Sequence, residues 1–355
     1  MDLKSLGFDD ARREELAALD GTGLEPARVG AATRDRCQLL GLGEPVWATL
    51  RGRLSEQTDD RLGLPAVGDW VLARRERDAF VVEQVLDRRS AFVRKAAGKS
   101  SLPQVVATNL DRVFAVTAVG PNFNPRRIER YLSAIWNGGA EPVVVVNKTD
   151  LPHDPVAIIE ELGEVALGVR TALVSAFREG GIDELLSLCE PGMTIALVGS
   201  SGVGKSTIVN QLLGHERQAT NEVRNSDHKG RHTTSDRQLF VAPSGSVLVD
   251  TPGMRELGLW NANDGVDRTF ADLLELAEKC QFRDCAHDTE SGCAVLDAVA
   301  RGELSAERLE SFQRLLREIA HNTRRTKENS KRRWKWIAQA KRDRARVLTK
   351  SGVKK

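Results

Sequence analysis

The stretch Gly199-Ser200-Ser201-Gly202-Val203-Gly204-Lys205-Ser206 decides the fold of this 355-residue chain. It matches the pattern G-x-x-x-x-G-K-[ST], in which backbone N–H groups close around phosphate oxygens. An apolar stretch at 194–198 precedes it, and residues 207–213 can continue as a helix, a context that disfavours a chance glycine-rich turn. The stretch therefore predicts a nucleotide site that also includes Thr207. We expect Lys205 at the β- and γ-phosphates and the Ser206 hydroxyl on Mg²⁺.

Two further motifs indicate that the base is guanine. Asn147-Lys148-Thr149-Asp150 follows an apolar stretch and has the form N-K-x-D, in which a carboxylate accepts two hydrogen bonds from N1–H and the exocyclic amine of guanine. Adenine lacks this pair of donors, and an unpaired buried carboxylate is costly, so the geometry rejects ATP. Ser175-Ala176 follows another apolar stretch and completes the base-binding loop. Either motif alone is more often an ordinary turn, but together they predict a guanine nucleotide.

The order of the motifs is unusual. Asp250-Thr251-Pro252-Gly253 supplies D-x-x-G after an apolar stretch at 247–249, where Asp250 can serve the Mg²⁺ shell and the Gly253 N–H can meet a γ-phosphate. In ordinary GTPases the phosphate loop comes first and the base-reading loops come last. Here N-K-x-D and S-A precede the phosphate loop, which indicates a circular permutation.

Four potential metal ligands lie close together in the last third of the chain. Their spacing is C-x4-C-x-H-x5-C, and the residues are Cys280, Cys285, His287 and Cys293. Three thiolates and one imidazole suit tetrahedral Zn²⁺, and a filled set of four leaves no place for catalytic water. We expect one structural zinc ion, the alternative being unrelated buried cysteines beside a surface histidine. Cys37 and Cys189 stand apart and are expected to act as small apolar residues.

The rest of the chain indicates several domains. Residues 46–91 hold short β-rich pieces separated by turn residues, which fit either an OB-fold barrel that binds oligonucleotides or a generic β-subdomain. Apolar stretches then alternate with helical ones, which predicts a parallel sheet covered by helices. We expect an unassigned extension at 1–40, a β-barrel of the OB-fold type that binds RNA at 41–103, a central α/β circularly permuted P-loop GTPase domain at 104–262, and a mostly helical zinc-binding domain with a basic tail at 263–355.

The net charge of +2 hides a strong asymmetry. Residues 324–355 contain fourteen Lys or Arg against two acids, whereas the remaining residues contain 38 basic and 48 acidic side chains. Two tryptophans, Trp334 and Trp336, lie among the cations, where they can stack on bases while the charges neutralise phosphates. The tail therefore favours an RNA partner over the alternative of a solvated tail. An apolar helical face within 305–322 is expected to pack between domains.

The motifs together resemble one known family, the circularly permuted, ribosome small-subunit-dependent GTPases (RsgA, also called YjeQ or EngC). The resemblance rests on the permuted motif order, on Gly230-Arg231-His232-Thr233-Thr234 as a first switch and on the cysteine–histidine cluster. It implies an OB-fold, a permuted GTPase and a zinc domain. It also implies binding of GTP and GDP, of the 30S subunit and its 16S rRNA, and a role in late 30S maturation with hydrolysis stimulated by that subunit. In such a switch, Thr233 or Thr234 would approach Mg²⁺ and the γ-phosphate.

The residue after D-x-x-G bears on catalysis. Many GTPases have a glutamine there to orient the attacking water, but this chain has Met254, whose thioether cannot do so. His232 is the nearest polar candidate in the switch loops, and its imidazole could orient water or take its proton. The alternative is that His232 only contacts rRNA. We expect catalysis to involve Lys205 and His232, with slow turnover until a partner orders the loop.

Two other function classes compete with a subunit-stimulated GTPase. One is an RNA-binding module in which GTP is a slowly hydrolysed structural ligand, and the other is a P-loop ATPase or kinase. No apolar run approaches the ~20 residues of a membrane helix, and the N-terminus lacks the order of a signal peptide. We therefore expect a cytoplasmic monomer without a membrane partner.

Overall fold

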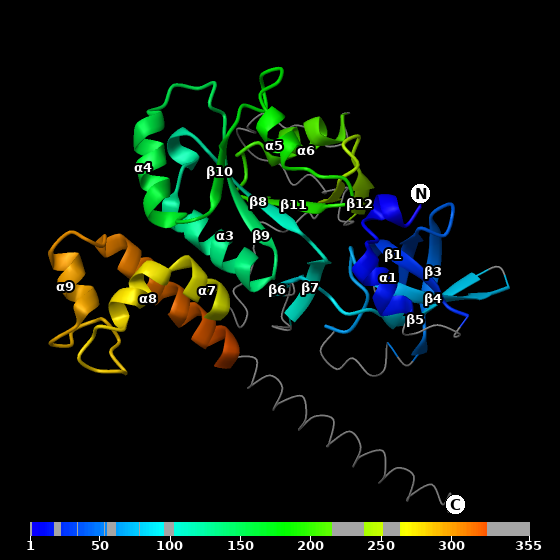
Figure 1. Ribbon diagram of the computed structural model, residues 1–355, viewed down its shortest axis with the longest axis horizontal. Helices are drawn as coiled ribbons and strands as arrows, with labels where there is room; N and C mark the ends of the chain where they lie inside the picture. The colour runs from blue at the N-terminus through cyan, green and yellow to red at the C-terminus, as the bar shows by residue number, and fades with distance from the viewer. Residues whose placement is uncertain are drawn as a thin grey trace, which may run out of the picture.

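The structure is a computed structural model that describes residues 2–17, 23–33, 35–52, 54, 62–77, 79–95, 103–214, 238–250 and 263–324. A β-barrel, a central α/β domain and a helical C-terminal part follow one another along the molecule (Figure 1). A 3₁₀ turn, Lys4–Leu6, and helix α1, Asp10–Ala17, lie before the barrel.

Five described strands close into the barrel in the order β1-β2-β3-β5-β4. Their bounds are Glu25–Ala32 for β1, Arg36–Leu40 for β2, Val46–Leu50 for β3, Trp70–Glu76 for β4 and Ala79–Val85 for β5. Neighbouring strands are antiparallel except β3 and β5, which run parallel. The prediction of an N-terminal barrel is confirmed. Its expected start at residue 41 is too late, because β1 and β2 come from the stretch left unassigned.

Arg28 explains why the sequence pattern did not predict strand β1. This charged residue lies in the middle of the strand and is only 1% exposed, and its neighbour Val29 is buried as well. The guanidinium lies 5.1 Å from the Trp70 ring centroid and donates to Thr194 Oγ1 at 2.8 Å, so it joins the barrel to the central domain. Burial lowers the pKa of Arg28 to about 10. A strand covered on both sides shows no alternation of apolar and polar residues.

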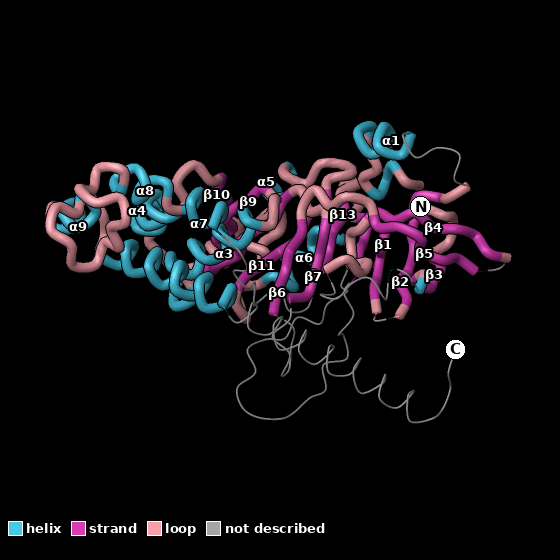
Figure 2. The backbone as a smooth tube through the Cα atoms, turned by 90° about the horizontal axis from the view of Figure 1, so that it is seen from below, coloured by secondary structure: helices cyan, strands magenta, loops and turns pink. Residues whose placement is uncertain are grey.

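The central domain is built on a sheet with the strand order β10-β9-β8-β11-β13-β12. The bounds are Arg112–Ala118 for β8, Glu141–Asn147 for β9, Arg170–Leu173 for β10, Thr194–Gly199 for β11, Gln238–Val241 for β12 and Val247–Asp250 for β13. Only β12 pairs antiparallel, so the predicted parallel sheet is confirmed and β12 is an unpredicted edge strand. A second unpredicted feature is the hairpin of β6, Ala91–Lys95, and β7, Pro103–Thr108. In Figure 2 the central strands lie between the barrel and the C-terminal helices.

Two helices of the central domain, α3 and α4, begin with a side-chain cap followed by proline. In α3, Pro125–Asn137, the Asn124 side chain accepts the Arg127 N–H at 2.9 Å, and in α4, Pro155–Val165, Asp154 accepts the Val156 N–H at 3.0 Å. These caps satisfy backbone donors that a helix N-terminus leaves unpaired. Two shorter helices follow, α5 at Asp183–Ser187 and α6 at Lys205–Leu213.

The C-terminal part is helical, as expected. It contains α7, Asn263–Thr269, α8, Ala271–Ala277, α9, Ala294–Ala300, and a helical segment at 306–324. That segment buries one apolar face made of Leu309, Phe312, Leu315 and Ile319, whereas Leu316 is 39% exposed. Among the described helices we find no stretch with both the length and the apolar character to cross a bilayer.

Candidate nucleotide site and metal cluster

The phosphate loop lies between β11 and α6, in the strand–loop–helix context that its sequence predicts. Two of its glycines are required by close contacts. Gly204 has φ +96°, and a Cβ there would lie 2.2 Å from Asn147 Nδ2; a Cβ on Gly199 would lie 2.3 Å from Val116 O. The Lys205 ammonium donates to the carbonyls of Gly199 at 2.7 Å and Ser200 at 2.5 Å, so its charge is directed into the loop.

Asn147 joins the phosphate loop to both base-reading loops. Its Nδ2 donates to Val203 O at 2.8 Å, and its Oδ1 accepts the Ala176 N–H at 3.0 Å. The side chain is 2% exposed, so these hydrogen bonds are protected from water. One amide therefore holds three loops from distant parts of the chain in a fixed arrangement.

Asp150 and Ser175 bring the N-K-x-D and S-A motifs together. Ser175 Oγ donates to Asp150 Oδ1 at 2.6 Å, and Thr149 Oγ1 donates to Val174 O at 3.0 Å. The hydroxyl of Ser175 is the main reason why the pKa of Asp150 lies below its usual value. The carboxylate is thus kept ionised and oriented, which is the state that can accept two hydrogen bonds from a base.

Gln211 takes part in this network although its sequence position gave no sign of it. Its Nε2 donates to Ala176 O at 2.7 Å, which connects α6 to the base-reading loop. No motif marks this residue, because a glutamine in a helix is common on any polar face.

The sheet brings the remaining motifs to the same edge. One motif follows the carboxyl end of each of four parallel strands, β9, β10, β11 and β13. In the sheet, β10 lies beside β9 and β11 lies beside β13, and only β8 separates the two pairs. Ligands bind at this edge in open α/β sheets. The base-reading strands β9 and β10 lie on one side of β11 and precede it in sequence, as the predicted permutation requires. Asp250 ends β13, whereas Gly253, Met254, His232, Thr233 and Thr234 lie outside the described residues.

The predicted metal ligands converge in the C-terminal part. The ligand atoms of Cys280, Cys285, His287 and Cys293 all lie within 4.8 Å of one another. The Cys280 and Cys293 sulfurs are 3.9 Å apart, and His287 Nδ1 lies 3.6 Å and 3.4 Å from them. Zinc bonds of about 2.3 Å to sulfur and 2.0 Å to nitrogen place tetrahedral ligands about 3.5–3.8 Å apart. The four residues therefore fit one zinc ion.

The chain around the cluster supports this ligand role. Leu296 N–H donates to Cys293 Sγ at 3.4 Å, and burial lowers the pKa of His287, which favours the neutral imidazole that binds metals. Glu290 accepts three backbone N–H groups of the same loop, and these bonds lower its pKa to about 2. Gln313 Nε2 donates to His287 O at 2.8 Å and ties the cluster to the helical segment 306–324.

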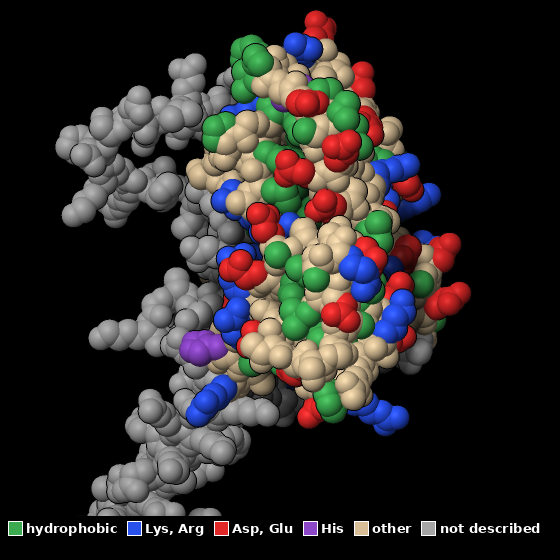
Figure 3. Space-filling view, turned by 90° about the vertical axis from the view of Figure 1, so that its left-hand side faces the viewer, with side chains coloured by type: hydrophobic (Ala, Val, Ile, Leu, Met, Phe, Trp, Pro, Cys, Tyr) green, Lys and Arg blue, Asp and Glu red, His purple; other side chains and the backbone are tan. Residues whose placement is uncertain are grey.

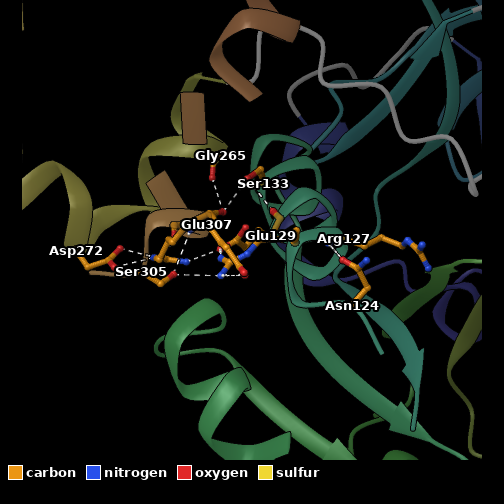
Figure 4. Close-up of polar contacts among 11 residues, drawn as sticks. Asn124, Arg127, Glu129, Ser133, Gly265, Asp272, Ser305 and Glu307 are labelled. Carbon is orange, nitrogen blue, oxygen red and sulfur yellow. Dashed lines mark hydrogen bonds and ion pairs between the residues drawn. The ribbon is translucent and has the colours of Figure 1, made fainter. Parts of the chain in front are cut away.

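Buried ion pairs fix the C-terminal part to α3 (Figure 4). Arg308, 2% exposed, donates to Glu129 at 2.8 Å and to Asp272 at 2.6 Å, and Glu129 is completely buried. Ser133 Oγ donates to Thr269 Oγ1 at 3.1 Å beside these pairs. The metal-ligand cluster and the nucleotide domain are thereby connected through the helical segment 306–324, which carries both Arg308 and Gln313.

The buried lone cysteines also behave as expected. Cys37 and Cys189 lie in apolar cores, and burial raises the pKa of their thiols to about 12 and about 11. Both thiols lie apart from the four residues of the metal-ligand cluster.

Known proteins resemble the chain over almost its whole length. Residues 85–260 match the family described as RsgA GTPase, and residues 194–328 match one described as 50S ribosome-binding GTPase. The chain is 41% identical to the small ribosomal subunit biogenesis GTPase RsgA of Opitutus terrae, over 98% of this chain and 99% of that protein. It is 42% identical to the protein of the same name from Methanosarcina acetivorans, over 86% and 82%.

Solved structures share the architecture. The crystal structure of YjeQ from Thermotoga maritima aligns with a TM-score of 0.61 and 26% identity, covering 84% of this chain and 99% of that one. YloQ, described as a circularly permuted GTPase, aligns with a TM-score of 0.58 at 24% identity, over 85% and 97%, and shows the same fold. Three observations agree: the strand order is permuted, the guanine motifs converge, and the sequence is similar to its relatives over most of their length. The chain therefore belongs to the RsgA GTPase family.

Proposed function

We propose that this protein binds the small (30S) ribosomal subunit and hydrolyses GTP to GDP and phosphate when the subunit stimulates it, in late 30S maturation. The observation that carries the proposal is the Asn147 side chain, which holds the phosphate loop against both guanine-reading loops. The relatives named small ribosomal subunit biogenesis GTPase support the choice of partner.

Different residues bind the base, the phosphates and the Mg²⁺ ion of GTP. Asp150 accepts the guanine N1–H and amine, while the Ala176 N–H and Asn147 complete the base-binding surface. Backbone N–H groups of residues 199–206 surround the phosphates, and Lys205 neutralises charge that develops on them. Mg²⁺ bound with GTP would be held by Ser206 and by Thr233 or Thr234, and it would neutralise phosphate charge.

The water-orienting group is assigned to His232. Met254 occupies the position where many GTPases have a glutamine, and a thioether cannot hold water in line. An imidazole ordered by the ribosomal subunit would supply the missing group, so that hydrolysis depends on binding.

The outer domains supply contacts with the subunit. The barrel and the basic tail contact 16S rRNA, and one structural zinc ion holds the C-terminal loop for docking. The protein acts as a monomer in the cytoplasm, where ribosomal subunits mature.

The decisive experiment measures single-turnover GTP hydrolysis with and without purified 30S subunits. We expect the subunits to accelerate hydrolysis by the native chain and His232→Ala to lose most of this acceleration while still binding GTP. An unchanged rate with subunits would identify an RNA-binding module with GTP as a structural ligand. Equal displacement of a bound GTP analogue by ATP would identify an ATPase or kinase instead.

A further inference from the structure

The outer side of α4 exposes a row of apolar positions. Three residues on its inner side are buried in a core shared with α3, namely Ile158, Leu162 and Val165. On the opposite side, Val156 is 61% exposed and Ile159 is 57% exposed. Gly163 follows one turn later, and a Cβ placed there would meet no described atom within 4 Å, so another chain can approach the helix closely. The spacing i, i+3, i+7 puts these three residues on one side of the helix, whereas exposed apolar residues are ordinarily scattered singly.

Carboxylates line this row. Glu160 and Glu164 are exposed, and neither is in an ion pair with another described residue. Like charges four residues apart repel, and the last turn of α4 has no basic side chain to balance the negative end of the helix dipole. Cations placed here would therefore relieve a repulsion. We name Val156, Ile159, Glu160, Gly163 and Glu164 the α4 face.

The chemistry of the α4 face limits what can bind to it. Figure 3 views the molecule toward α4 and the C-terminal part, and in its upper part hydrophobic and acidic side chains lie side by side. These carboxylates would repel the phosphates of a nucleic acid. A second copy of the chain in a two-fold interface would bring the same carboxylates against one another. The α4 face therefore fits a peptide segment that combines cations with apolar side chains.

The chain itself contains such a segment in its basic tail, residues 324–355. Fourteen basic side chains face only two acidic ones in this stretch, and Trp334, Ile337 and Leu348 are interspersed among the cations. The spacing of these three residues is that of one side of a helix. The basic tail thus offers apolar contacts and positive charge together.

The basic tail begins beside a helix that packs on α4. Arg324 is the last described residue of the helical segment 306–324, and Glu318 of that segment accepts a hydrogen bond from Arg130 of α3 at 2.8 Å. The buried core shared by α3 and α4 places the two helices side by side. If about 15 residues of the tail dock, the other half can span about 50 Å, whereas a domain of about 150 residues has a radius of gyration of about 15 Å. A site on the same chain meets the tail at an effective concentration in the millimolar range, so weak contacts are sufficient.

We propose that the α4 face holds the basic tail of the same chain while the tail is not bound to RNA. Val156 and Ile159 contact the apolar residues of the tail, Gly163 admits its close approach, and Glu160 and Glu164 pair with its cations. A docked tail cannot neutralise phosphates at the same time, so RNA competes with the α4 face for the same cations. Only this competition rests on the proposed function, which assigns RNA contacts to the tail.

Photo-cross-linking in the full-length chain tests the docking. With benzoylphenylalanine in place of Val156, irradiation at low salt should join this position to peptides from residues 324–355 of the same chain, with a yield that dilution does not change. Glu160→Lys/Glu164→Lys should lower the yield about fivefold or more, because cations then meet cations. The matched control is Glu184→Lys/Glu190→Lys, which reverses two exposed carboxylates elsewhere in the central domain and should leave the yield unchanged.

Affinity for single-stranded RNA tests the competition. A tail that is free for about a third of the time binds RNA about threefold more weakly than one that is always free. We therefore expect Glu160→Lys/Glu164→Lys to bind RNA about threefold more tightly than Glu184→Lys/Glu190→Lys, which carries the same added charge. Deletion of residues 324–355 from both variants should abolish the difference.

The outcomes separate the docking from the proposed function. No cross-link to the tail from benzoylphenylalanine at position 156 or at position 159 would overturn the docking. Cross-links only between two chains would also overturn it and assign the α4 face to a second copy. Cross-linking to the tail with equal RNA affinity of the two lysine variants would support the docking and refute the competition. If the tail docks but 30S subunits do not stimulate hydrolysis, the proposed function fails and the docking stands; GTP affinity of each variant confirms that it is folded.

Discussion

Asp150 is the side chain that we propose decides which nucleotide the protein accepts. Its carboxylate is oriented by Ser175 Oγ at 2.6 Å and is kept ionised by that hydrogen bond. An ionised carboxylate is an acceptor at both oxygens, so it complements the two adjacent donors of guanine and leaves adenine unpaired.

Asp150→Asn tests this role. The amide replaces one acceptor with a donor, so we expect GTP affinity to fall about tenfold or more and preference to shift toward xanthosine triphosphate. Competition of both nucleotides against a fluorescent analogue measures the shift. Unchanged GTP affinity would remove Asp150 from the base site.

Gln211 also supports the base-reading loop, but it does so indirectly, through Ala176. Its Nε2 holds Ala176 O at 2.7 Å, and the Ala176 N–H in turn bonds Asn147. We expect Gln211→Glu to place a carboxylate against that carbonyl and to speed GDP release roughly fivefold or more, because one hydrogen bond becomes a repulsion.

Stopped-flow release of a fluorescent GDP measures the effect, with Gln211→Met as the control that removes the donor without adding charge. A positioning role predicts that the preference for guanine over hypoxanthine nucleotides changes as well. Release as slow as in the native chain, for both variants, would show that the loop is held by Asn147 alone.

Among the described elements, α3 links the sheet to the C-terminal part, because it packs on the sheet and also carries the partners of the C-terminal part. Glu129 on α3 is completely buried, and its Oε1 accepts from both Arg126 and Arg308. Removing one partner of a buried pair leaves an uncompensated charge, whereas replacing both can be neutral.

Arg308→Met should therefore lower the free energy of unfolding of the C-terminal part by about 3 kcal/mol or more. The double variant Glu129→Gln/Arg308→Met should recover part of that loss, since it also removes the buried carboxylate, which in the single variant keeps only Arg126 of its two guanidinium partners. Urea unfolding followed by hydrogen exchange at residues 263–324 measures both. Equal stability of the single variant and the native chain would show that the ion pair does not hold the two parts together.

The loop with the metal cluster is an element with little regular structure, so the metal is expected to order it. Binding of zinc by thiolates contributes about 10 kcal/mol or more to the folding of such sites. We expect Cys285→Ser or a strong chelator to loosen the C-terminal part and weaken subunit binding, while GTP affinity survives. Metal analysis and limited proteolysis provide the measurements; carefully purified protein without zinc would contradict the assignment, and Cys189→Ser is the matched control.

At the scale of the whole molecule, charge is divided between the ends of the chain. Residues 324–355 carry fourteen basic and two acidic side chains, and the remainder is acidic overall. A protein that neutralises phosphates releases counterions, so its affinity falls with salt in proportion to the number of contacts.

Deletion of residues 324–355 should therefore weaken binding to 30S subunits and flatten its salt dependence, while GTP binding persists. Filter binding at several salt concentrations gives the slope for the native and shortened chains. The same slope for both would show that the tail makes no phosphate contacts.

Much of the nucleotide site could be predicted because its motifs are short and contiguous. A phosphate loop needs glycines at fixed places, as Gly199 and Gly204 show, and a base reader needs one carboxylate after a strand. The cysteine and histidine spacing predicted the metal cluster for the same reason, since all four ligands come from fourteen residues. Sites of this kind can be predicted because all the residues that they need lie within a short stretch of sequence.

Tertiary structure alone decided what joins these motifs. The sequence by itself determined the P-loop, the guanine motifs, their permuted order and the cluster of potential metal ligands. It did not determine that Asn147 bridges three loops, that Gln211 supports one of them, or that β1 with its buried Arg28 begins the barrel. Each of these depends on contacts between residues far apart in the chain, where a polar side chain is buried because a distant partner satisfies it. Such pairing leaves no periodic or local pattern, and only the folded chain brings the partners together.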